Sequence, residues 1–192
     1  MGRKGIYKRK TRETDVEASI CLDGSGGFTG GTGFGFFDHM LEELAFHGMF
    51  DISLSATGDA TGNHHLCEDA GICLGRALAI ALKGADEGGG PPITRFGWSL
   101  VPMDGSLARA ALDLSGRGGA WIQAERMDED IAEFLKAFAK ESCMNLHLDL
   151  LRCDNSHHGM EAAFKSLAIA LRAATRPDER RTGTPSSKGT IG

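Results

Sequence analysis

The sequence lacks the features that direct a protein to a membrane, to nucleic acid or to an oxidising compartment. No apolar run reaches the roughly 20 residues of a membrane-spanning helix, and no signal-peptide apolar segment follows the charged N-terminus. Lysine and arginine number 21 against 26 acidic residues, so the net charge of −5 leaves no basic excess for binding phosphate backbones. The five cysteines are an odd number without a C-x-x-C pair, which favours reduced thiols. We therefore expect a cytoplasmic protein that binds neither membranes nor nucleic acid.

Histidine is also scarce, yet it is concentrated in one motif that occurs twice. The chain has seven histidines, and four of them belong to two copies of His-His-x-x-Glu. These residues are His64, His65 and Glu68 in the first copy and His157, His158 and Glu161 in the second. On a helix, residues three apart share a face, so the second histidine and the glutamate of each copy are predicted to hold one ion. The first histidine points about 100° away, which indicates a second ion.

The pattern of apolar residues predicts two similar halves within one globular unit. At 192 residues and 41% hydrophobic content the chain is long enough to bury a core. The glycine- and proline-rich segment 84–92 is the predicted boundary, with the first half at 1–90 and the second, including a substrate-binding tail, at 91–192. Segment 6–22 has a charged start and then an alternating apolar pattern from Val16 to Leu22, which predicts a strand. The other predicted strands are 50–54, 96–101, 107–114, 120–124 and 145–151, and the predicted helices are 36–47, 65–83, 128–142 and 158–174.

An internal repeat connects the two halves and enlarges the candidate metal site. The register that aligns Leu41 with Leu135 and Ile52 with Leu146 also aligns His39 with Glu133. Two equivalent quartets follow, one of His39, His64, His65 and Glu68 and one of Glu133, His157, His158 and Glu161. Imidazole and carboxylate ligands without thiolate suit manganese, zinc, nickel or iron. His147 is the rival of Glu133 in the second quartet, but it aligns with Ser53 on a strand, and we interpret it as structural.

Short segments along nearly the whole chain resemble the imidazoleglycerol-phosphate dehydratase family. They are FFDHML at 36–41, HGMFD at 47–51, GD at 58–59, HHLCED at 64–69, DLSGR at 113–117, NSHHGMEAAFK at 155–165 and PSSKG at 185–189. The resemblance implies an α/β (α+β) fold of duplicated halves, with four helices packed between two four-stranded sheets. It also implies a homo-oligomer, a 24-mer whose active sites lie between subunits and hold two divalent ions, with Mn²⁺ expected.

The resemblance further implies a reaction and a role for each site residue. The family removes water from D-erythro-imidazole glycerol phosphate to give imidazole acetol phosphate in histidine biosynthesis. The implied catalytic residues are Glu13, as acid/base group, with Glu68 and Glu161, and the implied metal ligands are the two quartets. The implied substrate contacts are Glu13, Glu43, His47, Arg95, Arg117, Lys165, Ser186 and Lys188, of which the arginines, Ser186 and Lys188 suit a phosphate. Without the resemblance, Glu13 and the cations would be read as solvated surface charges, and Lys165 as an i,i+4 partner of Glu161.

The sequence departs from the family pattern near the predicted metals, which keeps alternative functions open. Gly62-Asn63 stands where two acids are usual, Glu43 where glutamine is common, Gly105 where an acid is usual and Glu133 where many members have a histidine ligand. One alternative is a divergent member with an altered substrate. Another is a shell protein in which metals only join subunits. A purely structural metal site would need neither Glu13 nor the phosphate-binding candidates, so their joint presence favours catalysis.

Overall fold

The chain folds into two sheets of the same strand order, each accompanied by two helices. A computed structural model describes residues 2–58, 62–83, 91–183 and 185–186. One four-stranded sheet has the order β1-β2-β4-β3 and the other the order β5-β6-β8-β7. The first half contains β1 (Lys4–Lys10), β2 (Asp15–Cys21), β3 (Phe28–Gly31), α1 (Gly35–Gly48), β4 (Asp51–Thr57) and α2 (His64–Lys83). The second contains β5 (Phe96–Met103), β6 (Ser106–Asp113), β7 (Gly119–Gln123), α3 (Glu129–Glu141), β8 (Asn145–Arg152) and α4 (Ser156–Thr175). The predicted duplicated α/β fold is confirmed.

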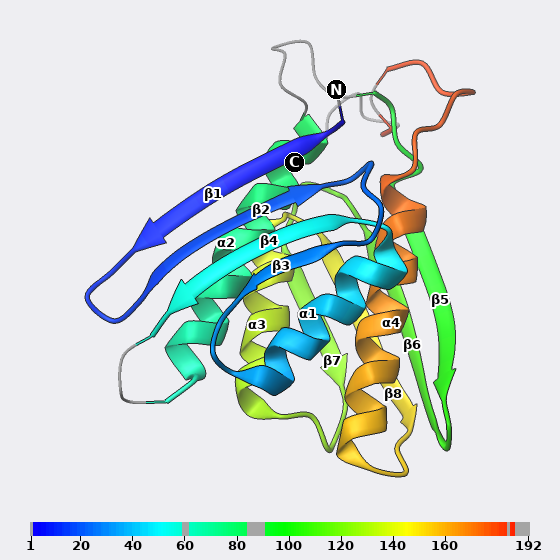
Figure 1. The fold of residues 1–192 in the computed structure, drawn as a ribbon. Coiled ribbons are helices and arrows are strands. Elements are labelled where there is room, and N and C mark those ends of the chain that lie inside the picture. Colours follow the sequence, from blue (N-terminus) through cyan, green and yellow to red (C-terminus); the bar gives the residue numbers. More distant parts are fainter. Residues whose placement is uncertain (1, 59–61, 84–90, 184, 187–192) are drawn as a thin grey trace.

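The helices lie between the two sheets, as Figure 1 shows. α2 packs on β1 and β2, α4 packs on β5 and β6, and across the middle α1 contacts α4 while α2 contacts α3. Strand alternation explains these layers, because β2 buries Val16, Ala18 and Ile20 while the residues between them are exposed or half-buried. Each sheet therefore turns one apolar face toward the helices.

Two strands differ from the sequence prediction. The charged start of the first half is itself a strand, β1, which pairs antiparallel with β2 instead of only preceding it. It lies at the edge of its sheet, where lysine and arginine side chains can reach solvent. Strand β3 was not predicted, because its sequence Phe-Thr-Gly-Gly has little strand propensity and forms only by pairing parallel to β4. The boundary at 84–92 stays a prediction, since residues 84–90 lie outside the described part of the chain.

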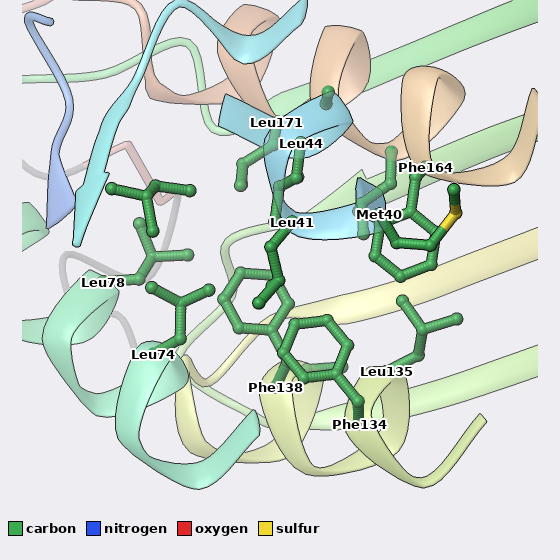
Figure 2. Packing of buried hydrophobic residues seen from close by; sticks show 14 of the residues in the cluster. Met40, Leu41, Leu44, Leu74, Leu78, Phe134, Leu135, Phe138, Phe164 and Leu171 are labelled. Carbon is green, nitrogen blue, oxygen red and sulfur yellow. The ribbon is translucent and has the colours of Figure 1, made fainter. Parts of the chain in front are cut away.

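Aromatic and aliphatic side chains from all four helices meet in the centre of the molecule (Figure 2). The Phe134 ring lies 4.9 Å from the Phe37 ring and 6.0 Å from the Phe164 ring, joining three helices. Each such fully buried side chain contributes about 1.5–3 kcal/mol from burial. The helix layer is therefore a common core that fixes the relative positions of residues from both halves.

All four helices begin at the same end of the molecule (Figure 1). Both His-His-x-x-Glu motifs occupy first turns, in α2 and in α4, so they lie at that end. The start of α4 is capped by Asn155, whose side chain accepts a hydrogen bond from the His158 backbone N–H. No helix in the described residues is both long and apolar enough to cross a membrane.

Candidate active site

Three predicted ligands converge where α1 packs against α4. Nε2 of His39 lies 3.5 Å from Oε1 of Glu161, and Nε2 of His157 lies 2.9 Å from the same oxygen. The ligand atoms of these three residues all lie within 4.8 Å of one another. Two imidazoles and a carboxylate at this spacing match the donors that bind manganese or zinc, so the residues present fit a divalent ion. We call this group the α1–α4 cluster.

The cluster corrects two predictions about how the motifs are used. Glu161 shares its face with His157, one full turn away, and not with His158 as the sequence interpretation had it. His158 points elsewhere, with Nδ1 3.1 Å from Oδ2 of Asp154 and Nε2 3.6 Å from Oδ2 of Asp104. Within one chain, His39 lies with the second motif and not in a quartet with the first. The expected divergence of neighbouring histidines is present, but the grouping crosses the halves.

A charged chain of side chains continues from the cluster along α1 and α4. Nζ of Lys165 lies 2.6 Å from Oε2 of Glu161 and 3.6 Å from Oε2 of Glu43, which in turn lies 3.0 Å from Nε2 of His47. Burial raises the pKa of Glu161, but the hydrogen bond and charge of Lys165 outweigh it and hold the pKa below its ordinary value. Glu161 is therefore anionic at neutral pH, the form in which a carboxylate can bind a divalent ion. The i,i+4 ion pair of Lys165 is present, and its substrate contact stays a prediction.

The equivalent region of α2 and α3 is arranged differently. Nδ1 of His65 lies 3.7 Å from Oε2 of Glu13, which projects from the turn between β1 and β2. Nδ1 of His64 lies 3.5 Å from Oδ1 of Asp130 on α3. Glu133, one turn further along α3, is paired with Lys136 at 2.6 Å. Glu68 is exposed.

Within the described residues, the side chains of this α2–α3 region form no three-ligand group like the α1–α4 cluster. His147, the rival of Glu133, lies on the outer face of the second sheet with its ring stacked on Trp121 at 4.9 Å, while its neighbours Leu146 and Leu148 are buried toward the helices. Within one chain His147 is therefore separated from α2 and α3 by its own sheet.

The predicted phosphate-binding residues gather at the opposite end of the helices. The guanidinium of Arg95 donates to Asp113 at 2.6 and 2.9 Å and to the carbonyl of Pro185 at 2.7 Å, which brings Ser186 of the tail close to it. The backbone N–H of Arg95 donates to the carbonyl of Ala174 in the last turn of α4. Arg117 is exposed and follows Gly116, whose N–H donates to Cys143 just beyond the end of α3. Lys188 lies outside the described residues.

Several polar residues beside the site were missed in the sequence. They are Asp130, Asp104 and Asp154, each within hydrogen-bonding or ion-pairing distance of a motif histidine, and Asp69, which follows Glu68 directly. The hydrogen bond from Ser106, followed by the contact with His158, lowers the pKa of Asp154 to about 2, so this residue is a carboxylate facing the imidazole. Asp154 could have been suspected from its place just before the cap of the motif helix, whereas Asp104 comes from a distant turn.

Comparisons with known proteins identify the family of this chain. The imidazoleglycerol-phosphate dehydratase family matches residues 32–171. An imidazoleglycerol-phosphate dehydratase of Thermoanaerobacter sp. (strain X514) is 46% identical over 98% of this chain and 100% of its own length. The enzyme of that name from Cereibacter sphaeroides is 45% identical over the same shares.

Two solved structures extend the likeness to the fold. The crystal structure of IGPD from Pyrococcus furiosus in complex with (S)-C348 has a TM-score of 0.80 and 35% identity, and the match covers 96% of this chain and 99% of that one. Imidazoleglycerol-phosphate dehydratase from Staphylococcus aureus has a TM-score of 0.74 and 31% identity, over 90% of this chain and 99% of that one. The sequence motifs, the duplicated fold and these matches together show that the chain belongs to the imidazoleglycerol-phosphate dehydratase family.

Proposed function

We propose that this chain dehydrates imidazoleglycerol phosphate to imidazole acetol phosphate at a site that holds two divalent ions, with Mn²⁺ the expected ion. Membership of the family makes it a hydro-lyase of histidine biosynthesis. The observation that carries the metal proposal is the convergence of His39, His157 and Glu161 within 4.8 Å of one another. These residues would not need to converge with partly exposed imidazole rings if they served only to stabilise the fold.

The chain offers ligands for two ions. The α1–α4 cluster would hold one, and the remaining predicted ligands would complete its shell and hold the other; these are His64, His65, Glu68, Glu133 and His158. Bound divalent ions supply Lewis acidity and a template that orients the imidazole ring. Because Glu133 stands in a histidine's place, its site would have less net positive charge, which favours a hard, oxygen-preferring ion such as Mn²⁺.

The separation of the two ends supports active sites shared between subunits. His157 lies in the first turn of α4, whereas the backbone N–H of Arg95 donates to the carbonyl of Ala174 near the end of the same helix. At 1.5 Å per residue the distance along the helix is about 25 Å. A small phosphorylated imidazole cannot span that distance. The phosphate of a substrate at the metal cluster would therefore be bound by residues of a neighbouring subunit, as in the proposed homo-oligomeric 24-mer. These residues would be Arg95, Arg117, Ser186 and Lys188.

Glu13 is the proposed proton acceptor. Its carboxylate is more than half exposed and lies 3.7 Å from a nitrogen of His65, so a substrate beside the metals would meet it. Glu43, His47 and Lys165 form the polar wall beside the α1–α4 cluster, where Lys165 also holds Glu161 in its anionic form. These residues are proposed to contact and orient the imidazole end of the substrate. The chain thus supplies a base, ring contacts and phosphate contacts from separate elements.

The proposal is tested by activity, metal content and mass on one preparation. Purified protein loaded with manganese is expected to convert imidazoleglycerol phosphate, and Glu13→Gln is expected to abolish turnover while two manganese ions per chain remain. Glu17→Gln is the matched control, since Glu17 is an exposed acid of the same hairpin that pairs with Lys8. Mass measured before and after chelation tests whether metals hold the assembly together.

Two alternatives give different results in the same experiment. A shell protein whose metals only join subunits would assemble with manganese and form no product, which would overturn the proposal. A divergent member would bind the substrate and release a different product or none, which product analysis by mass spectrometry would detect. The exposed Glu13 carboxylate beside His65 favours catalysis over a purely structural metal site.

A further inference from the structure

Asp69 joins the helix of the first motif to the hairpin that carries Glu13. It follows Glu68 on α2, but its side chain points into the protein and the residue is only 7% exposed. Oδ1 accepts a hydrogen bond from Nε of Arg9 at 2.7 Å, and Oδ2 accepts one from the hydroxyl of Thr14. Arg9 is near the end of β1 and Thr14 directly precedes β2. One buried carboxylate therefore holds both sides of the β1–β2 turn against α2.

The turn transmits this anchoring to Glu13. Thr11 accepts hydrogen bonds through its hydroxyl from the backbone N–H groups of Glu13, at 3.1 Å, and Thr14, at 3.0 Å. The N–H of Thr11 in turn donates to the carbonyl of Thr14 at 2.9 Å. The backbone of Glu13 is thus held between residues that are themselves tied to Asp69, while its side chain extends to 3.7 Å from His65.

Each oxygen of the Asp69 carboxylate accepts a hydrogen bond. The hydrogen bond to Asp69 raises the pKa of Arg9, and the guanidinium lies 2.7 Å from the buried carboxylate. Burial of such an ion pair costs desolvation energy. Replacement of a buried ion pair by hydrophobic residues of similar size often leaves a fold equally or more stable. A role beyond stability is therefore worth seeking.

The second half of the repeat forms its corresponding turn without such an acid. The register that aligns Glu68 with Glu161 places Ala162 at the position of Asp69. The β5–β6 turn is instead tied by Ser106, which donates to Asp154 ahead of α4. The duplicated fold therefore does not require a buried aspartate on the helix. The half that has the aspartate is the half whose turn carries Glu13.

We propose that Asp69, acting through Thr14, is a positioning residue that sets the Glu13 carboxylate beside the motif histidines, so that turnover depends on it although it does not touch the substrate. The proposal rests on the proposed role of Glu13. Displacement of a reacting group by about 1 Å can cost about 100-fold in rate. The anchoring is thus expected to affect kcat more than substrate binding.

The test uses the assembled, manganese-loaded enzyme and variants of Thr14. Thr14→Val keeps the shape and removes the hydroxyl, and it is expected to lower kcat about 10- to 100-fold with KM changed less than about twofold and manganese content unchanged. Thr14→Ser keeps the hydroxyl and is expected to restore most of the turnover. Ser99→Ala is the control, because it removes a buried hydroxyl that donates to the Ser166 carbonyl at 2.7 Å in the other half. It is expected to lower Tm without lowering kcat.

If Thr14→Val does not assemble, a second variant and hydrogen exchange test the same anchoring. Arg9→Gln removes the guanidinium, which is the other hydrogen-bond donor to Asp69. The Arg9 side chain is 41% exposed, and the variant is expected to lower kcat as Thr14→Val does. Hydrogen exchange of the backbone amides at 10–15 is expected to accelerate in either variant, while exchange along α2 stays unchanged.

The outcomes separate this inference from the proposed function. Wild-type kcat in Thr14→Val, with Glu13→Gln inactive, overturns the positioning role and leaves the proposed function intact. Equal loss of kcat in Thr14→Val and Ser99→Ala also overturns it, because general destabilisation then explains both. Full turnover by Glu13→Gln removes the proposed role of Glu13 and this inference with it, while dehydration by the wild-type protein would still stand.

Discussion

The helix pairs α1–α4 and α2–α3 occupy equivalent places in the repeat but carry different chemistry. In the first pair the Phe36 ring lies 5.3 Å from the ring of His157. In the second, the equivalent contact joins Asp130 to His64 at 3.5 Å. The two halves therefore share the positions that are in contact but differ in the residue types at those positions. A hydrophobic ring next to one histidine and a carboxylate next to the other give the two regions different charge.

The two pairs also differ in how closely their helices approach. A Cβ added to Gly71 of α2 would lie 2.5 Å from the carbonyl oxygen of Phe134 on α3, so the backbones meet directly. The equivalent position of α4 is Phe164, whose buried ring separates α4 from its neighbours. Identical spacing of the candidate ligands in both pairs is therefore not expected, and among the described residues only the α1–α4 pair gathers three of them within one chain.

The largest effect is expected from removing the carboxylate of the gathered cluster. Glu161→Gln is expected to remove one manganese ion per chain and to lower turnover by at least about 100-fold, since even residues that only orient ligands cost about 10–100-fold. Glu68→Gln, the equivalent change in the other pair, is expected to remove the other ion and leave the α1–α4 ion bound. Metal content and manganese titration measure both. Loss of the same ion in both variants would show that the pairs do not form separate sites.

Helix spacing is tested by Gly71→Ala. The added methyl would contact the backbone of α3, and such overpacking costs about 1–3 kcal/mol of unfolding free energy, or about 2–4 °C of Tm for each kcal/mol. Gly35→Ala is the control, because no atom lies within 4 Å of its added Cβ. It is expected to be neutral or to stabilise by about 0.4–1 kcal/mol. Equal Tm values for the two variants would contradict the close approach of α2 and α3.

The smallest effect concerns Asp51, whose equivalent in the second half is Asn145. Backbone N–H groups of Ser25 and Gly27 donate to Asp51 and hold the pKa of that carboxyl below its ordinary value. Its contribution to stability is therefore present above the unfolded pKa of about 3.9 and is lost as pH falls through the lower folded pKa. Asp51→Asn is expected to lower Tm by about 1–3 °C at pH 7.

The same variant gives the pH dependence that checks this cause. The difference in Tm between the wild-type protein and Asp51→Asn is expected to shrink below pH ~4 and to vanish once the wild-type carboxyl is protonated. Asn145→Asp, made in the other half, offers no such N–H pair to the new carboxyl within the hydrogen bonds of the described residues and is the control. A Tm difference that persists unchanged at low pH would mean that the charge of Asp51 contributes nothing.

Much of the fold was predictable because apolar periodicity survives in both halves. The helices were placed within about two residues, since Leu41, Leu44 and their repeat partners mark one buried face. Strand β3 and the charged strand β1 were missed because pairing with a neighbouring strand, and not local propensity, forms them. Asp69 was missed as well, since only the hairpin folding over α2 gives its carboxylate partners.

The sequence by itself determined the duplicated fold, the two His-His-x-x-Glu motifs and the likeness to the family, because repeat register, rare residues and motif order are properties of the linear chain. Only the tertiary structure decided which ligands meet. His39 joins His157 and Glu161 because α1 packs against α4, a contact between halves that no local spacing encodes. The tertiary structure also places Arg95 at the end of α4 far from that cluster, since core packing sets the direction of a helix relative to its neighbours.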